Sequence, residues 1–221
     1  MCGRFSLFDL LGLEVRFNLS LPDILNPRYN IAPSQDILTI TNNEGFQATH
    51  LKWGLIPFWS KDISSAKKMI NARAETVDQK LSFKQSFKSR RCLIPADGFY
   101  EWKKEGNKKR PFRIVMKNED VFAFAGLWDG WSSPEGETIY SCAILTTSAN
   151  AMIEPIHNRM PVILSKEGEE TWLREDADIP TLQSLLIPYP AKLMDCYEVS
   201  TRVNSPRNDD PDIIKPAAAD L

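Results

Sequence analysis

The sequence predicts an α+β protein whose β-rich core is a strongly curved sheet or a barrel, with a few short helices at its periphery. Strand-like runs of β-branched and aromatic residues recur along most of the chain, separated by turns that contain Gly, Asn and Pro. Helical spacing is confined to short segments. The 221 residues, 43% hydrophobic and 25% charged, are typical of one soluble globular domain, or at most two small ones.

A helix is expected near the beginning of the chain. Apolar residues from Leu7 to Phe17 are spaced for one face of a helix over 6–17. Ser6 is its expected N-cap, and Asp9 follows three residues later. The next segment, 21–34, is rich in Pro and Asn and is expected to be a loop.

A β-hairpin is expected next. Strands over 36–42 and 46–53 are joined by the turn Asn-Glu-Gly at 43–45. The aromatic segment 54–60 is expected to be a loop, and 78–88 a short helix.

The middle of the chain predicts a second hairpin. Strands are expected over 91–94 and 98–103, with a break at Pro95-Ala96-Asp97. The turn Glu-Gly-Asn at 105–107 leads into a partner strand over 110–116.

Short elements are expected in the second half. The strands are 121–128, 138–146, 162–164 and 196–199, and the helices are 167–174 and 180–186. From Thr201 the chain is polar and rich in Pro, and this tail is expected to lie against the surface.

The net charge of −2 argues against a globally basic nucleic-acid-binding protein, but the charge is uneven. Between 80 and 113 there are eleven Lys or Arg and three acidic residues, so the rest of the chain is acidic. A basic patch of this kind either follows a phosphate backbone or forms a solvated face, and charge alone leaves both open.

Cysteine usage and hydropathy exclude several classes. The four cysteines form no CxxC pair and there are two histidines, so neither a zinc site nor a disulfide framework is expected. No apolar run of about 18 residues and no signal-peptide pattern is present. A cytoplasmic protein without a membrane span is therefore expected.

Cys2 offers unusual chemistry. A Met before a small residue is normally trimmed, and Cys2 would then carry a free α-amine of pKa about 8 beside a thiol of pKa about 8.5. The amine can condense with an aldehyde to an imine, and the adjacent thiol can then close a thiazolidine ring. Alternatively, Cys2 is simply a small buried hydrophobic residue.

Four further positions carry polar side chains in unusual places. Glu101 shares a strand face with Phe99, so its carboxyl should have a raised pKa suited to proton transfer; the alternative is an edge-strand ion pair with a lysine. His157 lies in a turn between prolines and is an acid/base candidate or a histidine that bonds loop carbonyls. Asn71 and Arg73 share one face of an extended segment and suit a sugar beside a phosphate. Their alternative roles are a backbone cap and an ion pair of Arg73 with Glu75.

Six stretches, in this order and at these spacings, resemble one known family. They are Met-Cys-Gly-Arg-Phe at 1–5, Tyr-Asn-Ile-Ala-Pro at 29–33, Trp-Gly-Leu-Ile-Pro-Phe-Trp at 53–59, Asn-Ala-Arg-Ala-Glu-Thr at 71–76, Arg-Cys-Leu-Ile-Pro-Ala-Asp-Gly-Phe-Tyr-Glu-Trp at 91–102 and Ile-His-Asn-Arg-Met-Pro at 156–161. The chain resembles the SOS-response-associated peptidase (SRAP) family, which includes abasic-site-shielding proteins of bacteria and eukaryotes. The resemblance implies a single SRAP-fold domain over 2–206, followed by a polar tail over 207–221.

The resemblance also implies an activity. The protein would remove its own Met1, and Cys2 would then form a thiazolidine crosslink with an abasic site in single-stranded DNA, with associated lyase activity. Asn71 would orient the amine and the sugar, Glu101 would shuttle protons, and His157 would assist opening of the sugar ring and crosslink reversal.

Seven further positions resemble DNA contacts of the family. Arg4, Arg73 and Arg159 match phosphate contacts, and Pro33, Phe58, Trp59 and Thr146 match DNA-lining positions. Phe58 stands where some members have a second Trp. The resemblance implies neither a cofactor nor a metal, and we expect a monomer that is cytoplasmic and joins the nucleoid when DNA is damaged.

Two functions of other classes remain open. N-terminal-cysteine glutamine amidotransferases also begin Met-Cys-Gly and use the thiolate to attack a side-chain amide, although their glutamine-binding motifs are not seen here. A non-catalytic reader of modified DNA bases would bind without needing the amine of Cys2.

Overall fold

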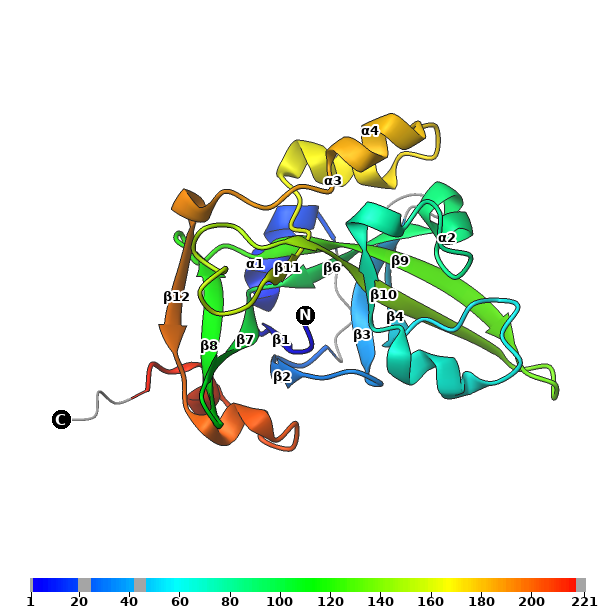
Figure 1. Ribbon diagram of the computed structural model, residues 1–221. Helices are drawn as coiled ribbons and strands as arrows, with labels where there is room; N and C mark the ends of the chain where they lie inside the picture. The colour runs from blue at the N-terminus through cyan, green and yellow to red at the C-terminus, as the bar shows by residue number, and fades with distance from the viewer. Residues whose placement is uncertain (1, 20–24, 42–46, 218–221) are drawn as a thin grey trace.

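The computed structural model describes residues 2–19, 25–41 and 47–217. These ranges hold twelve β-strands and four short α-helices, so the predicted β-rich α+β class is confirmed (Figure 1). No helix in the described ranges is long and apolar enough to cross a membrane.

Five strands close into a barrel. In order around the ring they are β10 (Thr138–Ser148), β4 (Gln47–Trp53), β3 (Asp36–Thr41), β6 (Arg91–Ala96) and β9 (Phe122–Ser132). Pairing of β9 with β10, from Thr138 opposite Ser132 onward, completes the circle. The β10–β4 contact is parallel and the other four are antiparallel.

A second sheet packs beside the barrel, at the left of Figure 1. Its strand order is β12 (Met194–Glu198), β8 (Lys108–Met116), β7 (Gly98–Glu105), β1 (Phe5–Leu7) and β2 (Arg28–Ile31). Two short strands, β5 (Asn71–Arg73) and β11 (Arg159–Pro161), pair with β10 of the barrel. β5 and β11 thus join the barrel to the segments that carry the predicted site residues.

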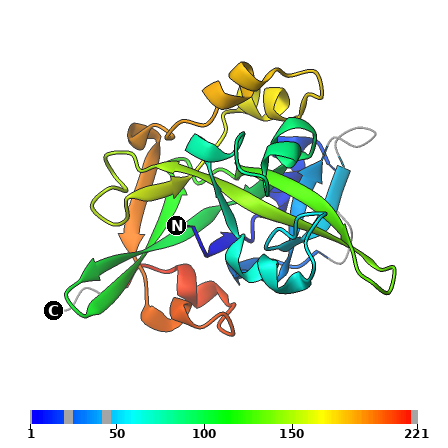
Figure 2. The same ribbon diagram turned by 45° about the vertical axis from the view of Figure 1, so that its right-hand side comes forward.

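Side chains alternate along the barrel strands between the interior and the outer face. The interior side chains of β6, β9 and β10 include Cys92, Ile94, Phe122, Phe124, Cys142 and Ile144. The outer face is covered by α2 (Lys84–Ser89), α3 (Lys166–Leu173) and α4 (Ile179–Ser184), which contribute the buried side chains of Phe87, Trp172 and Leu182 (Figure 2). The helices therefore protect an apolar barrel surface.

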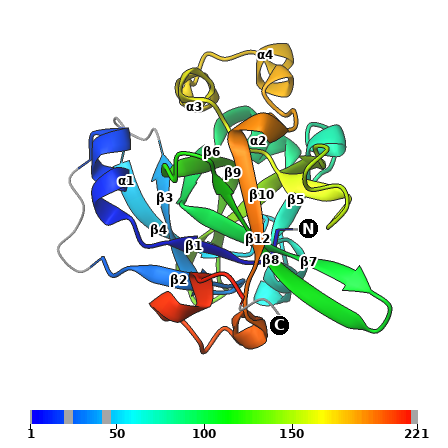
Figure 3. The ribbon, with the colours of Figure 1, turned by 90° about the vertical axis from the view of Figure 1, so that its left-hand side faces the viewer.

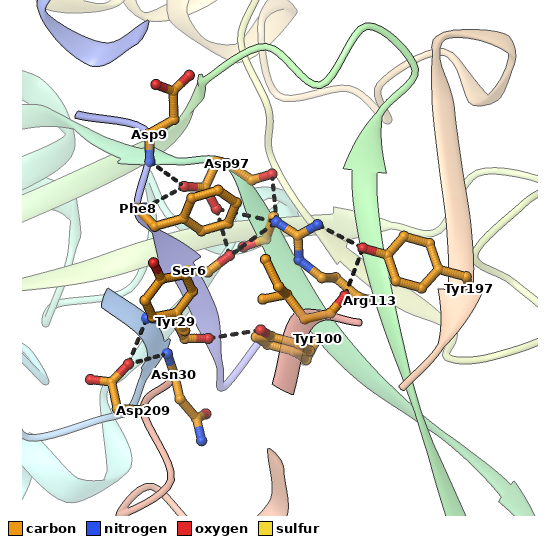
Figure 4. A network of polar contacts seen from close by, with 12 residues as sticks. Ser6, Phe8, Asp9, Tyr29, Asn30, Asp97, Tyr100, Arg113, Tyr197 and Asp209 are labelled. Carbon is orange, nitrogen blue, oxygen red and sulfur yellow. Dashed lines mark hydrogen bonds and ion pairs between the residues drawn. The ribbon is translucent and has the colours of Figure 1, made fainter. Parts of the chain in front are cut away.

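A buried polar network ties the beginning of the chain to the second sheet (Figure 4). The hydroxyl of Ser6 donates to Asp97 Oδ1 at 2.6 Å, and Arg113 Nη2 lies 3.3 Å from the same oxygen. Asp97 also accepts from the backbone N–H groups of Phe8 and Asp9. Burial raises the pKa of Asp97, while these donors and Arg113 act in the opposite direction.

The predicted N-terminal helix is wrong at its start. Helix α1 spans Leu10–Phe17, and its N-cap is Asp9, which accepts from Gly12 N at 2.9 Å. Ser6 lies instead in β1, where its hydroxyl donates a hydrogen bond to Asp97 and does not cap a helix. The predicted loop over 21–34 is also partly wrong, since β2 occupies Arg28–Ile31; residues 20–24 lie outside the described ranges.

Most other expected elements are confirmed with shifted ends. The strands of the first hairpin pair as predicted, although its turn at 43–45 lies outside the described residues. The predicted break at Pro95-Ala96-Asp97 is reduced to Asp97, because β6 continues through Ala96. The helix predicted over 78–88 begins only at Lys84. The strand predicted over 162–164 lies slightly earlier, as β11, and Ile163 forms a single bridge with Phe124.

The remaining elements are 3₁₀ turns. They span Ile63–Lys68, Ala74–Thr76, Ala191–Leu193, Thr201–Asn204 and Pro211–Ile214. The last two belong to the tail, where Val203 and Ile213 are buried against Tyr100. The C-terminal segment thus packs under the second sheet, as Figure 3 shows in orange and red.

Gly126 makes the barrel interior sensitive to a single methyl group. A Cβ at this position would lie 2.7 Å from Cys92 Sγ and 2.8 Å from Ile94 Cδ1. We expect Gly126→Ala to lower the free energy of unfolding by about 1–3 kcal/mol through overpacking. Urea denaturation measures this loss.

Gly168→Ala is the matched control for that substitution. Its Cβ would meet nothing nearer than Ser165 Oγ at 3.3 Å, and the residue lies within α3, where Ala favours the helix. A Gly126→Ala protein as stable as Gly168→Ala would contradict the tight interior packing.

Candidate active site

Cys2 lies three residues before strand β1 and is fully buried. The pairing of β1 with β7 places Phe5 opposite Phe99, and Tyr100 N donates to Arg4 O at 2.9 Å. These contacts align the Cys2 end of the chain with the part of β7 that carries Glu101. Burial and the charge of Glu101 both raise the pKa of the Cys2 thiol, so the sulfur is held as a thiol.

Asn71, in strand β5, contacts the backbone of Cys2. Its Nδ2 donates to the carbonyl of Cys2 at 2.9 Å, and its backbone lies in β5, opposite Ile144 of the barrel. The amide oxygen Oδ1 is buried and accepts no hydrogen bond from any described residue. An acceptor without a donor therefore lies next to the backbone of the candidate nucleophile.

Glu101 is buried on the same face of β7 as Phe99, as the sequence predicts. Burial raises the pKa of its carboxyl, while the nearby His157 acts in the opposite direction. The alternative of an exposed edge-strand ion pair is excluded, because the side chain is only 3% exposed. Glu101 thus interacts electrostatically with both Cys2 and His157.

His157 is held by the turn that leads into β11. Its Nδ1 accepts a hydrogen bond from the backbone N–H of Arg159 at 3.0 Å. Nδ1 also lies 3.2 Å from the carbonyl oxygen of Arg159, so the backbone of the turn orients the ring through this nitrogen. Nε2 lies outside these backbone contacts and is the ring nitrogen suited to proton transfer.

Arg73, Thr146 and Arg159 come together because their strands are neighbours. Thr146 of β10 lies opposite Arg73 of β5 and opposite Pro161 of β11. The guanidinium of Arg159 donates to both carboxylate oxygens of Glu75, at 2.5 and 3.0 Å, and to Thr146 O at 2.6 Å. This hydrogen bonding lowers the pKa of Glu75.

The ion pair considered for Arg73 and Glu75 is not the one that forms. Glu75 binds Arg159 instead, and the exposed Arg73 makes no hydrogen bond or ion pair with the described residues. Arg73 is thus a cation open to solvent beside a neutralised pair.

Arg4 is integrated into the fold. Its Nη1 donates to Asn30 Oδ1 and to Val203 O, both at 2.7 Å, and its guanidinium lies over the ring of Trp102, 5.9 Å from the centroid. Nη1 is therefore used within the protein, and the phosphate contact expected of Arg4 must be made by the other nitrogens of its guanidinium.

Phe58 and Trp59 expose 58% and 45% of their surfaces from a firmly anchored loop. Ile56 N donates to Ser141 Oγ at 2.8 Å, and Phe58 N donates to Asp129 Oδ2 at 3.0 Å. Pro33 lies near the start of this loop, because the adjacent Ser34 N donates to Trp53 O at 2.8 Å.

Asp129 was missed by the sequence interpretation, as were the roles of Glu75 and Asp97. A signal for Asp129 existed: it is a single acid within the apolar strand run Leu127-Trp128-Asp129, and a buried carboxylate in such a run needs donors. The partner of Glu75 depends on β11, which is 84 residues away, and no local signal identifies it.

The site combines a buried thiol, an unused amide acceptor, a carboxyl with a raised pKa and an imidazole oriented by the backbone. Such a set can form and break C–N and C–S bonds with proton transfer. Within the described ranges, no group of three or more His, Cys, Asp or Glu residues is placed to hold a metal ion.

Comparison with known proteins identifies relatives over nearly the whole chain. The family model described as "SOS response associated peptidase (SRAP)" matches residues 1–206. The protein named "Abasic site processing protein YoqW" of Bacillus subtilis is 50% identical, over 97% of this chain and 99% of its own. "Abasic site processing protein HMCES" of Xenopus tropicalis is 31% identical, over 86% of this chain and 66% of its own.

Solved structures agree with the fold. A crystal structure of a protein from Bacteroides thetaiotaomicron superposes with a TM-score of 0.88 at 31% identity, covering 98% of this chain and all of the other. A Bordetella bronchiseptica protein superposes with a TM-score of 0.78 at 27% identity, covering 90% of this chain and all of the other.

Burial of Glu101 predicts a measurable cost in stability. Because its folded pKa is raised, the group favours folding below its unfolded value of about 4.5, and this contribution is lost as pH rises from there through the folded pKa. We expect Glu101→Gln to match the wild type near pH 4 and to be more stable at pH 7. Thermal unfolding at both pH values measures the difference.

Glu105→Gln, on the same face of β7, is the control with the opposite sign. Hydrogen bonds from Lys103 and Arg110 lower the pKa of Glu105, so its stabilising contribution is present above its unfolded pKa and lost as pH falls through the folded one. Equal responses of the two variants to pH would contradict the buried state of Glu101.

Proposed function

This chain belongs to the SOS response associated peptidase (SRAP) family, and from that premise we propose that it captures abasic sites in single-stranded DNA as a thiazolidine at Cys2. The single observation that carries the proposal is the position of Cys2. Its carbonyl is held by Asn71, and its thiol lies within the field of Glu101. The names of the B. subtilis and X. tropicalis relatives support abasic sites as the substrate.

The first step frees the amine. Hydrolysis of the peptide bond between Met1 and Cys2 consumes one water and leaves Cys2 with an α-amine. We include this step in the activity of the protein itself, with Glu101 and His157 as the groups that move protons. An amide nitrogen at Cys2 cannot form an imine, so crosslinking depends on this cleavage.

Imine formation follows at C1′ of the ring-opened sugar. The amine adds to the aldehyde, and the resulting carbinolamine loses its hydroxyl as water after accepting a proton. Glu101 suits this proton transfer, because burial keeps its carboxyl protonated to higher pH than that of an exposed glutamate. His157 is suited to protonate the sugar oxygen through Nε2 during ring opening, because the backbone of Arg159 contacts Nδ1.

Ring closure forms the stable product. The thiol adds to the carbon of the protonated imine, the new C–S bond forms, the nitrogen keeps its own proton, and the thiol proton leaves the sulfur. Since burial raises the thiol pKa, this proton needs an acceptor, and the carboxylate left after the preceding step provides it. The unused Oδ1 of Asn71 is suited to accept a hydrogen bond from the amine or a sugar hydroxyl.

DNA binding needs no base-reading group at the lesion. An abasic nucleotide has no base edge, so phosphate contacts and stacking of the flanking bases must supply the affinity. Arg73 and Arg159 are suited to the phosphates, with the phosphate competing with Glu75 for Arg159. Phe58 and Trp59 are suited to stacking, at about 1–3 kcal/mol per base, and single strands leave bases free for it.

The imine also permits strand cleavage. Removal of a proton from C2′ would eliminate the 3′ phosphate, which is lyase chemistry. Thiazolidine closure competes with this route by consuming the imine, so we propose that lyase activity is the minor outcome.

Intact mass spectrometry tests the function directly. After incubation with an oligonucleotide that carries one abasic site, we expect the loss of Met1 and an adduct with the mass of protein plus DNA minus water. Fully processed protein whose mass is unchanged by the damaged strand would refute the proposal.

Cys2→Ser separates the two bond-forming steps. The variant keeps an amine but lacks a sulfur, so we expect an imine that borohydride traps and no adduct that survives without it. Cys196→Ser, at a half-buried thiol in β12, is the control and should form the stable adduct normally. A stable adduct of Cys2→Ser would show that the sulfur is not needed.

A further inference from the structure

The β7–β8 hairpin extends beyond Glu101 and projects from the body of the protein (Figures 2 and 3). It carries five of the eleven basic residues between 80 and 113: Lys103, Lys104, Lys108, Lys109 and Arg110. The catalytic proposal above uses none of them.

The two faces of this hairpin differ in charge balance. On the face shared with Glu101, Lys103 bonds Glu105 at 2.7 Å, and Arg110 bonds both Glu105 and Glu198. The positive charges of this face are therefore largely neutralised.

The opposite face carries Lys104 and Lys109 directly across from each other. Both are exposed, and among the described residues neither makes a hydrogen bond or an ion pair. Like charges directly opposite on neighbouring strands destabilise a hairpin. The repulsion between two such lysines is relieved when an anion binds to both of them.

This lysine face is the side of the hairpin opposite Glu101. It meets the candidate site at Arg4, because Trp102 precedes Lys104 by two residues on the same face and its ring lies beneath the guanidinium of Arg4. Lys104 is three residues from Glu101, or about 10 Å along the strand, and a bound strand of DNA must also cross from one face of β7 to the other. At about 3.4 Å per phosphate of a stacked strand, the separation is therefore about three nucleotides or more.

We propose that Lys104 and Lys109 form a second phosphate-binding site, which holds the backbone of the damaged strand about three or more nucleotides from the abasic position. This inference rests on the proposed function for the identity of the ligand. In this proposal the hairpin contacts the DNA that flanks the lesion and not the lesion itself. Trp102 and Arg4 connect the hairpin site with the candidate active site.

Binding of a non-reactive probe tests the site without any crosslinking. The probe is a fluorescent single strand of about 15 nucleotides that carries a central tetrahydrofuran analogue of an abasic site. We expect the double variant Lys104→Gln/Lys109→Gln to bind it about tenfold more weakly at low salt, with a salt dependence reduced by about 1.4 in log–log slope. On a trinucleotide with the same central analogue, variant and wild type should be equal.

Lys103→Gln/Lys108→Gln is the matched control, because it removes the same two charges from the other face of the same hairpin. Its salt dependence should stay close to that of the wild type. Equal losses in both double variants would mean general attraction and would overturn the proposal, as would unchanged binding by Lys104→Gln/Lys109→Gln. If the protein forms no adduct but its binding of the probe still depends on Lys104 and Lys109, the hairpin site stands and the crosslinking function is refuted.

Discussion

The pairing of β1 with β7 is the constraint on which the site depends. Phe5 lies opposite Phe99 and Ser6 opposite Gly98, and this register brings the Cys2 end of β1 alongside Glu101. A slip by one residue would turn the side chains of β1 to the other face of the sheet and would move Cys2 relative to Glu101. The buried Ser6–Asp97–Arg113 network fixes the register, and removing one partner of such a network typically costs about 3–5 kcal/mol. The absence of a side chain at Gly98 leaves room for the guanidinium of Arg113, since a Cβ at position 98 would lie 2.6 Å from Arg113 Nη2.

The sequence predicts those parts of the fold that local signals determine. The hairpin over 36–53 was predictable because alternation and a turn signal coincide, and the β7–β8 hairpin because Gly106 marks its turn. The first helix was misplaced because Ser6 looks like an N-cap, whereas its hydroxyl bonds a carboxylate 91 residues away. Strand β2 was missed because its partner β1 had been assigned to that helix.

The same distinction between local signals and distant contacts applies to the candidate site. Cys2 and Glu101 were accessible from their chemistry and their position on a strand face, and the roles of Asn71 and His157 came largely from resemblance to a family. The pairing of Glu75 with Arg159 and the anchoring of the aromatic loop by Asp129 depend on contacts between distant strands. Patterns within one segment contain no information about such contacts.

The short strand β1 has a mechanical consequence. A protein bonded to DNA through Cys2 would be pulled at the end of β1, for instance when a motor advances along the captured strand. Inter-strand hydrogen bonds are perpendicular to the strands, so tension along β1 would load its bonds to β2 and β7 in shear, all at the same time. The three residues of β1 would therefore resist such a force together, and Gly3 and Arg4 alone would separate the bonded Cys2 from the strand.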